Sequence, residues 1–482
     1  MLVDHVFESC RMTAGMFFLK SLPVCKTYIN KLNETLEYAK LPKLNCAQSL
    51  FLSICISGII ITNSVCWKRF ERSSFGKFCS ENLSKMFRRS NIDWESLLHI
   101  SVLNIFKTYD ITKGILALDD TDNKRSKKTT AIHKAHKIKD KSSGGFINGQ
   151  ELLFLLLITN KLTIPVGFCF YQPDPDYSEW KKQDKKLRKQ MVPKSARPAK
   201  PTRNTNFPTK QESAIALIKQ FKCSHESIIV QAILADALYG STGFVSRIIL
   251  IYPASQVISQ VKSNQKVRMH GKYISIEEYF RRHSGVEQPL KIRGGQEEIV
   301  TMNGARLYLK AHGCKRFIVA LKYADEDKYR YLVASNMTWR LTDIARAYTL
   351  RWLVEVFIQD WKGYEGWCQL AKQPGDEGSY RGVILSLMSD HCLLLHHEQK
   401  ALIDNKLPAA TVGSLRDLER AQAIVDSVEE VVNSQDTNLL IQSLKDAIEN
   451  VIPLRESSKH MSGRDLGRLE PTPSLKHMPV AA

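Results

Sequence analysis

Closely spaced cysteines are absent from this sequence. Its eleven cysteines are scattered singly between Cys10 and Cys392, and no C-x-x-C pair occurs. Zinc ribbons and disulfide frameworks depend on such spacing, so the pattern argues against both. It suits a protein of a reducing cytoplasm.

Long apolar runs are also scarce. The segment from Cys46 to Trp67 carries no charge and is nearly long enough to span a bilayer. Seven Ser, Thr, Asn and Gln side chains interrupt it, so we expect a buried core helix there. No basic start followed by a compact apolar run marks a secretory signal. We therefore expect no membrane span.

Positive charge is abundant. The 482 residues include 69 Lys and Arg against 49 Asp and Glu, a net charge of +20. A hydrophobic content of 43% with 24% charged residues is typical of a soluble globular protein, and this length predicts two or three domains. The excess charge favours a polyanionic partner, above all nucleic acid. An anionic membrane surface is the competing partner.

The periodicity divides the chain into regions of different character. Residues 1–110 are expected to be helical. Residues 111–262 and 337–400 alternate strands and helices, which predicts an α/β core. We expect strands at residues 114–118, 152–158, 164–170 and 227–236, and helices at residues 209–221 and 382–397. Residues 263–336 are expected to form a β-rich insertion. Residues 401–482 are expected to form a helical tail, with helices at residues 421–432 and 439–451 and a disordered end.

Two apolar strands end in carboxylates. The run from Gly114 to Leu118 is followed by Asp119 and Asp120, and the strand from Ser227 ends in Asp236. Lysine-rich segments at residues 124–141 and 180–210 are expected to be loops, the second either a solvated tether or a DNA-contacting arm.

Tyr348 to Lys362 (YTLRWLVEVFIQDWK) predicts one amphipathic helix. At about 100° per residue, its polar side chains fall within roughly 60° of arc. The opposite face is apolar and wide enough to be buried. The polar face presents Tyr348, Arg351, Glu355 and Lys362. Without further carboxylates nearby, it would be an ordinary surface helix with one Arg–Glu pair.

Asp120, Asp236 and Glu355 are the candidate metal ligands. Carboxylates at the ends of neighbouring strands can converge on one side of a sheet. A helix packed across that sheet can add a third carboxylate. Carboxylate oxygens suit Mg²⁺, and two ions about 4 Å apart support phosphoryl transfer by water or a 3′-hydroxyl.

The spacing Tyr348-x₂-Arg351-x₃-Glu355-x₆-Lys362 resembles the Tyr-Arg-Glu-Lys signature of bacterial insertion-sequence transposases of family four. These are DDE recombinases with an RNase H-like core. Asp120-Thr121 after an apolar strand and Asp236 in LADALYG are similar to the family's two catalytic aspartates. The resemblance covers about residues 112–398, including the β-rich insertion.

This resemblance implies an RNase H-like mixed sheet flanked by helices and a cut-and-paste transposase. Strand cleavage, hairpin formation and strand transfer would use two Mg²⁺ ions, or Mn²⁺, held by Asp120, Asp236 and Glu355. Tyr348, Arg351 and Lys362 would bind phosphates. The partners would be double-stranded transposon ends and target DNA. Residues 1–110 would bind the DNA end, and the tail would form a homodimer in a bacterial cytoplasm, near the nucleoid.

Several assignments stay open at this level. Only the match to Asp-Thr selects Asp120 over Asp119. A flipped base is held by a tryptophan in this family, with Trp339 and Trp180 as candidates. His391, Cys392, His396 and His397 have a spacing that could bind zinc, although partly buried helix residues explain them more simply.

Three alternative functions remain. A hydrolytic nuclease or resolvase on the same fold would need the carboxylates but not the other signature residues. A non-catalytic DNA-binding descendant of a transposase would need none of them. A membrane-associated basic protein is the third.

Overall fold

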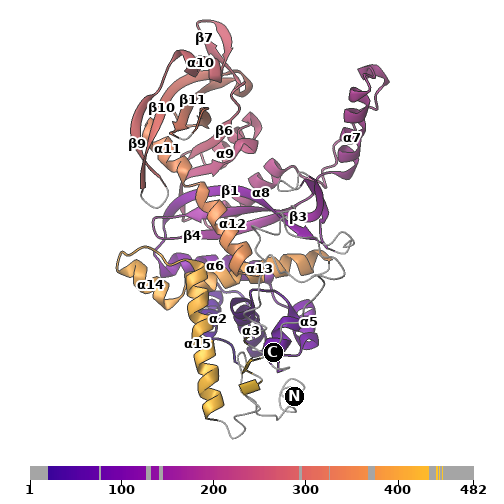
Figure 1. The fold of residues 1–482 in the computed structure, drawn as a ribbon, viewed down its shortest axis with the longest axis vertical. Coiled ribbons are helices and arrows are strands. Elements are labelled where there is room, and N and C mark those ends of the chain that lie inside the picture. Colours follow the sequence, from indigo (N-terminus) through magenta and orange to yellow (C-terminus); the bar gives the residue numbers. More distant parts are fainter. Residues whose placement is uncertain are drawn as a thin grey trace, which may run out of the picture.

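A computed structural model describes residues 20–74, 77–125, 132–139, 145–292, 296–324, 326–366 and 375–433, with a few positions between 441 and 448. The strands of these residues form one twelve-stranded, mostly antiparallel sheet. The molecule is elongated, with a β-rich end, a central sheet and a helical end (Figure 1). The protein is therefore mixed α/β, as the sequence predicts.

Five strands make up the central sheet, in the order β4-β3-β1-β5-β6. β1 and β4 are antiparallel to β3, whereas β5 is parallel to both β1 and β6. The short β2 also pairs with β3. The bounds are β1 Lys113–Arg125, β2 His136–Lys139, β3 Phe146–Ile158, β4 Thr163–Tyr171, β5 Ile229–Ala235 and β6 Gln256–Val261. The predicted strands at residues 114–118, 152–158, 164–170 and 227–236 are confirmed.

Helices cover both faces of this sheet, because residues along each strand alternate in the direction of their side chains. One face carries Ala117, Leu152 and Phe154 and packs against helices α12 and α13. The other carries Leu116, Leu118 and Leu153 and packs against helices α8 and α9. The bounds are α8 Lys210–Ser224, α9 Thr242–Ile251, α12 Trp352–Tyr364 and α13 Gly375–Leu394.

The N-terminal segment is helical, as predicted. Its described helices are α2 Pro23–Tyr38, α3 Cys46–Thr62, α4 Trp67–Ser73, α5 Ser80–Arg89 and α6 Trp94–Thr108. Asn45 and Gln48 form a capping box at the start of α3, and Asn63 ends the helix in the left-handed conformation. Nearly every residue of α3 from Phe51 onward is buried, which confirms the core helix predicted there.

No single helix in the described ranges is both long and apolar enough to cross a bilayer. Only α3 and α4 taken together, across a bend of 80°, meet the criteria of length and composition.

Residues 263–336 contain strands that continue the central sheet. β12 pairs antiparallel with β6, and β11, β10, β7 and β8 follow outward, with β9 on β10. A small separate core lies between these strands and helix α10. The bounds are β7 Lys266–Met269, β8 Lys272–Ser275, α10 Ile276–Arg282, β9 Val286–Ile292, β10 Gln296–Leu309, β11 Cys314–Tyr323 and β12 Arg330–Ala334.

The prediction of a single helix from Tyr348 to Lys362 is wrong. Helix α11 (Leu341–Thr349) ends before Leu350, and α12 begins at Trp352. The junction keeps helical dihedral angles, but its backbone bonds join residues three apart, as in Arg351 N–H to Tyr348 O and Val354 N–H to Arg351 O. Such a tightened turn has about 3.0 residues per turn instead of 3.6 and shifts the angular positions of the residues that follow it, so the four signature residues do not share one face of a regular α-helix.

The two basic segments also differ from the expected loops. Of residues 124–141, the first two complete β1 and residues 136–139 form β2, while residues 126–131 and 140–141 lie outside the described residues. Residues 175–189 form helix α7 (Pro175–Lys189), which projects from the body of the protein (Figure 1). Asp174 caps this helix and Pro175 occupies its first turn. Asp184 pairs with Arg188 and Arg197, which holds the returning chain against it.

The C-terminal region continues with α14 (His397–Asp404) and α15 (Val412–Val432). The predicted helix at residues 382–397 is therefore two helices, because α13 starts seven residues earlier and stops at Leu394. The helix predicted at residues 439–451 falls largely outside the described residues.

Candidate active site

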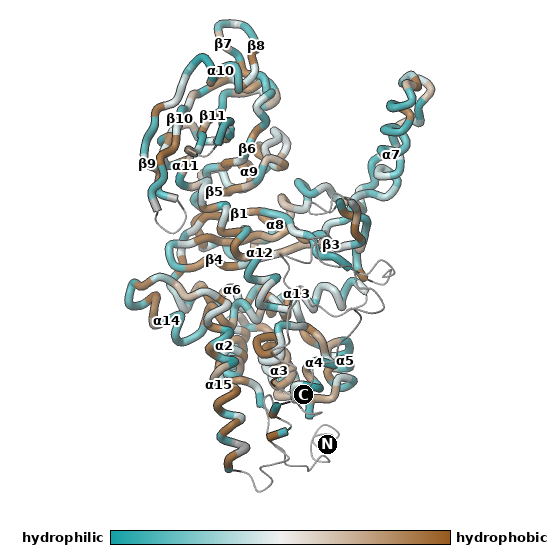
Figure 2. The backbone as a smooth tube through the Cα atoms, viewed as in Figure 1, coloured by the Kyte–Doolittle hydropathy of each residue, from teal (hydrophilic) through white to brown (hydrophobic). Residues whose placement is uncertain are grey.

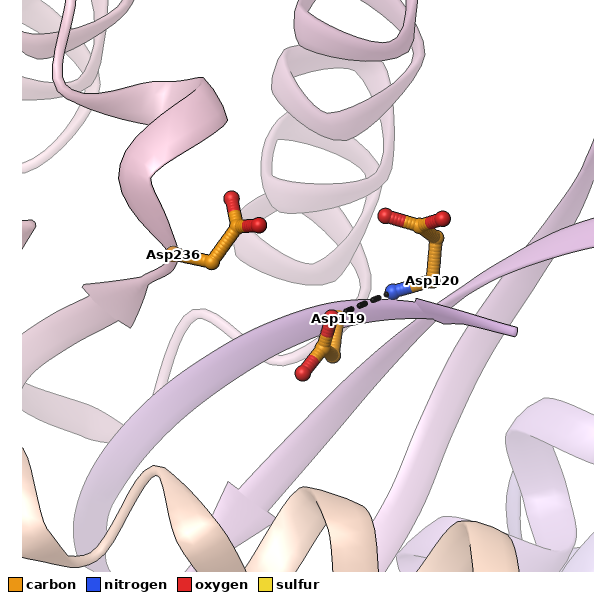
Figure 3. A group of neighbouring side chains, drawn as sticks. All are labelled: Asp119, Asp120 and Asp236. Carbon is orange, nitrogen blue, oxygen red and sulfur yellow. Dashed lines mark hydrogen bonds between the residues drawn. The ribbon is translucent and has the colours of Figure 1, made fainter. Parts of the chain in front are cut away.

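Three aspartates converge at the middle of the sheet. Asp119 and Asp120 of β1 and Asp236, directly after β5, each place a carboxylate oxygen within 4.8 Å of the others. Asp120 and Asp236 lie on the same side of the β1 ribbon, and Asp119 lies on the other (Figure 3). The structure thus brings together the two predicted aspartates, and it adds the one that the sequence left open.

The geometry of β1 explains this convergence and corrects one expectation. β1 does not end at the aspartates but continues to Arg125, because it pairs with β3 along its length. Its parallel pairing with β5 stops at Ala117. Beyond that point the two strands separate, and Asp236 lies at the carboxyl end of β5 in the resulting opening. Ligand sites of α/β sheets commonly occupy such crevices.

Asp236 is held firmly in this opening. Its side chain accepts a hydrogen bond of 2.9 Å from the Leu238 backbone N–H. Its backbone oxygen accepts a hydrogen bond of 2.6 Å from the Ser259 hydroxyl of β6. Gly240 follows, where a Cβ atom would collide with the Gln260 carbonyl oxygen. The turn after β5 therefore packs directly on β6.

The aspartates carry unfavourable negative charge. Burial raises the pKa of Asp119, although the Arg351 guanidinium opposes the effect, and it also raises the pKa of Asp236. Repulsion from Asp120 adds to both shifts. A bound cation would relieve this repulsion.

Arg351 links the aspartates to Glu355. Its guanidinium donates to an Asp119 oxygen at 2.6 Å and to a Glu355 oxygen at 2.5 Å. Among the described residues, Glu355 is not part of the group of close carboxylates, and its side chain is 49% exposed. Glu355 thus lies beside the cluster, separated from it by a guanidinium that both share.

Tyr348 and Lys362 flank this arrangement. Tyr348 is partly buried at the end of α11, and burial raises its pKa, with the Arg351 guanidinium acting against the shift. Lys362, near the end of α12, donates to the backbone oxygen of Asp122 on β1. Arg351 and Lys362 therefore join the α12 segment to β1, with Glu355 beside Arg351 and Tyr348 just before them at the end of α11.

A second set of charged residues contacts Asp120 from the opposite face. Lys210, the first residue of α8, places its ammonium 2.7 Å from Asp120 Oδ2 and 2.9 Å from Glu151 Oε1 on β3. His136 of β2 lies 3.3 Å from the other Glu151 oxygen. Although burial opposes it, the two carboxylates raise the pKa of Lys210, which keeps the ammonium charged.

The sequence analysis did not identify Lys210, Glu151 or His136 as site residues. Two local signals could have indicated the first two. Thr209-Lys-Gln-Glu212 is a capping box that places Lys210 at a helix start. Glu151 directly precedes the apolar run 152–158. Pairing of β1 with β3 puts Glu151 near Asp120, and packing of α8 on the sheet adds Lys210.

The remaining candidates lie elsewhere. Trp180 is on α7, stacked on Tyr177 and hydrogen-bonded to the Pro198 carbonyl. Trp339 precedes α11 and packs against the main core. His391 contacts Ser101 and the Pro165 carbonyl, and His396 contacts Glu419. These histidines have structural partners, and within the described chain the three aspartates are the only group suited to a metal.

Comparison with known proteins gives a remote likeness. No protein-family model matches the sequence, and no curated protein matches it. The fold is similar to that of the piggyBac transposase in a synaptic complex with hairpin DNA, determined by cryo-EM, with 12% sequence identity and a TM-score of 0.41. The alignment covers 92% of this chain and 86% of that one. At this distance it adds nothing to the residues of the site.

Proposed function

We propose that this protein is a DNA transposase that moves an insertion sequence by metal-dependent strand cleavage, hairpin formation and strand transfer. The observation that carries the proposal is the convergence of Asp119, Asp120 and Asp236 beside Arg351 and Tyr348. The mixed sheet β4-β3-β1-β5-β6, covered by helices on both faces, supports the RNase H-like core that the sequence resemblance implies.

The donor set fits a hard divalent cation. It consists of carboxylate oxygens, the ligands that Mg²⁺ and Mn²⁺ favour, and the raised pKa values of Asp119 and Asp236 reflect charge that a cation would balance. Asp120, Asp236 and Glu355 would hold two Mg²⁺ ions, with Asp119 as an additional candidate. Such ions activate the attacking hydroxyl and stabilise the departing oxygen.

The polar and positively charged side chains around the aspartates would position the DNA. Arg351 presents a planar fork of N–H donors that suits a phosphate, and it already lies against both Asp119 and Glu355. A phosphate that binds Arg351 would weaken its contact with Glu355 and free that carboxylate for a metal. Lys362 and Tyr348 lie on either side of Arg351 in the chain and would contact the same strand.

A DNA cleavage assay with the wild-type protein tests the proposal directly. DNA that carries the sequences flanking this reading frame is incubated with Mg²⁺ or with EDTA, and the products are separated on denaturing gels. Mg²⁺-dependent hairpins would support the transposase. Nicks without hairpins would favour the hydrolytic nuclease, and bound but uncut DNA would favour the non-catalytic descendant.

Cutting two transposon ends together needs two active sites, and α15 offers a surface for a second subunit. Leu418, Val425, Val428 and Val432 are 49%, 49%, 44% and 70% exposed. With Ala421 they follow a spacing of 3, 4, 3 and 4 residues, which is the a/d seam of a coiled coil. The opposite face of α15 packs on the body of the protein, and hydrophobic residues recur along the lower part of α15 in Figure 2. We therefore propose a homodimer through α15.

Val425→Glu is expected to weaken this dimer at least about tenfold in Kd. An unpaired carboxylate at the centre of an apolar seam costs more than the 1.4 kcal/mol that a tenfold change requires. Sedimentation velocity over a range of concentrations measures the change. Gln422→Glu is the control, because it adds the same charge on α15 outside the apolar positions. A variant that dimerises like the wild type would rule out this seam.

A further inference from the structure

Lys210 occupies an unusual place between two carboxylates from neighbouring strands. Its ammonium contacts Asp120 of β1 and Glu151 of β3 together, and its side chain is only 18% exposed. An ammonium removed from water to this degree is costly unless it is paired. Lys210 is thus fixed against Asp120 and is not a freely solvated surface lysine.

The start of α8 determines this position. Thr209 accepts from the Glu212 N–H, and the Glu212 carboxylate accepts from the Thr209 N–H and from Arg203. Lys210 follows the cap directly, on the face of the sheet to which α8 packs. Asp120 points to the same face, whereas Asp119 points toward α12. The two adjacent aspartates therefore have different cationic partners, Lys210 and Arg351.

We propose that Lys210 is the resident counter-ion of Asp120, which a divalent cation must displace, so that this lysine sets the cation concentration at which the site fills. The proposal rests on the metal-dependent function proposed above. It assigns a positioning role to Lys210, Glu151 and His136.

The contacts indicate how the displacement proceeds. Within the described chain, Asp236 has no ion pair, so a cation there needs the Asp120 oxygens as its next ligands. Lys210 already binds one of them. Glu151 retains the ammonium after it leaves Asp120, with the Tyr171 ring 5.2 Å away as a second support. His136 holds the far Glu151 oxygen. The cation therefore breaks one ion pair of the lysine and leaves the other intact.

Cation binding without DNA tests this role. The full-length protein is titrated with Mn²⁺, and the free ion is measured by electron paramagnetic resonance. Lys210→Met is expected to tighten binding about tenfold, the scale on which neighbours of metal ligands act. Lys210→Arg restores the competing charge and is expected to bind like the wild type. Glu151→Gln is expected to weaken binding several-fold, because it removes negative charge and leaves the ammonium to Asp120 alone.

Two controls separate this proposal from the proposed function. Lys161→Met removes a partly buried lysine of the β3–β4 turn whose ammonium donates to the Tyr109 carbonyl, and it should leave Mn²⁺ binding unchanged. Asp236→Asn should abolish it. If Asp236→Asn acts as expected but Lys210→Met binds no tighter, the counter-ion role is overturned and the metal site stands. If the wild type binds no Mn²⁺, both fail.

Discussion

Asp236→Asn is expected to lower Mg²⁺-dependent DNA cleavage at least about 10³-fold. The carboxylate is one of the three that converge, and a cation at such a site supplies several kcal/mol of transition-state stabilisation. The substitution keeps the shape of the side chain and its bond from the Leu238 N–H. Since burial and repulsion already raise the pKa of Asp236, the neutral side chain should not reduce the melting temperature. Initial cleavage rates and thermal melting of the same preparation measure both effects.

Parallel variants distinguish the neighbouring carboxylates. Asp120→Asn should match Asp236→Asn if Asp120 is the ligand, as the resemblance implies, and Asp119→Asn should then be much milder. Glu355→Ala should also abolish cleavage while leaving Mn²⁺ binding by the aspartates largely intact, since Glu355 lies outside their cluster. Asp343→Ala, an exposed carboxylate in the first turn of α11, is the control. Full activity of Asp236→Asn would refute the proposed site.

The stability of the protein is expected to fall as the pH rises from about 4, the ordinary pKa of a carboxyl group, through about 7, the pKa of the buried Asp390. Glu365, directly after α12, and Asp390 of α13 are fully buried side by side. Burial raises the pKa of both, that of Asp390 to about 7, and the two carboxyls can share a proton. The folded state therefore holds protons that the unfolded state has released above its ordinary pKa near 4. Stability is highest below that value and decreases up to the folded pKa.

The groups that face this pair do not cancel the effect. Asp360 also raises the pKa of Glu365 and Arg416 of α15 lowers it, but the net shift remains upward because burial is its largest cause. The Asn63 side chain joins α3 to the same corner through Gly363 and Gly366, and Gly366 has a φ of +83° that favours glycine. Ionisation of the pair would therefore loosen the junction between the N-terminal helices, the core and the tail.

The double variant Glu365→Gln/Asp390→Asn isolates this contribution. Its melting temperature should change less with pH than that of the wild type. The stability of the double variant minus that of the wild type should therefore increase toward pH 8. Each pKa unit removed corresponds to about 1.4 kcal/mol. Asp376→Asn at the start of α13 is the control, because backbone hydrogen bonds lower the pKa of this exposed carboxyl. Identical pH profiles for the wild type and the double variant would refute the shared-proton pair.

The sequence by itself determined much of the fold. Short apolar runs predicted β1, β3, β4 and β5, and apolar content or amphipathic spacing predicted helices such as α3 and α8. It also singled out the pair Asp119–Asp120 and Asp236, because a carboxylate directly after an apolar strand is a local pattern, while only the resemblance to Asp-Thr selected Asp120. Each of these features depends on a few consecutive side chains, and such patterns can be read without tertiary contacts.

Only the tertiary structure decided how the site is assembled. β1 continues past its aspartates because β3 pairs with it, and this pairing brings Glu151 near Asp120, while the packing of α8 on the sheet brings Lys210 to both. The turn at Leu350 and Arg351 breaks an otherwise regular helix pattern, and it places Arg351 between Asp119 and Glu355. The ion pairs of Asp120 with Lys210 and of Asp119 with Arg351 join residues 90 and 232 positions apart in the chain, so their energies depend on packing that no local periodicity records.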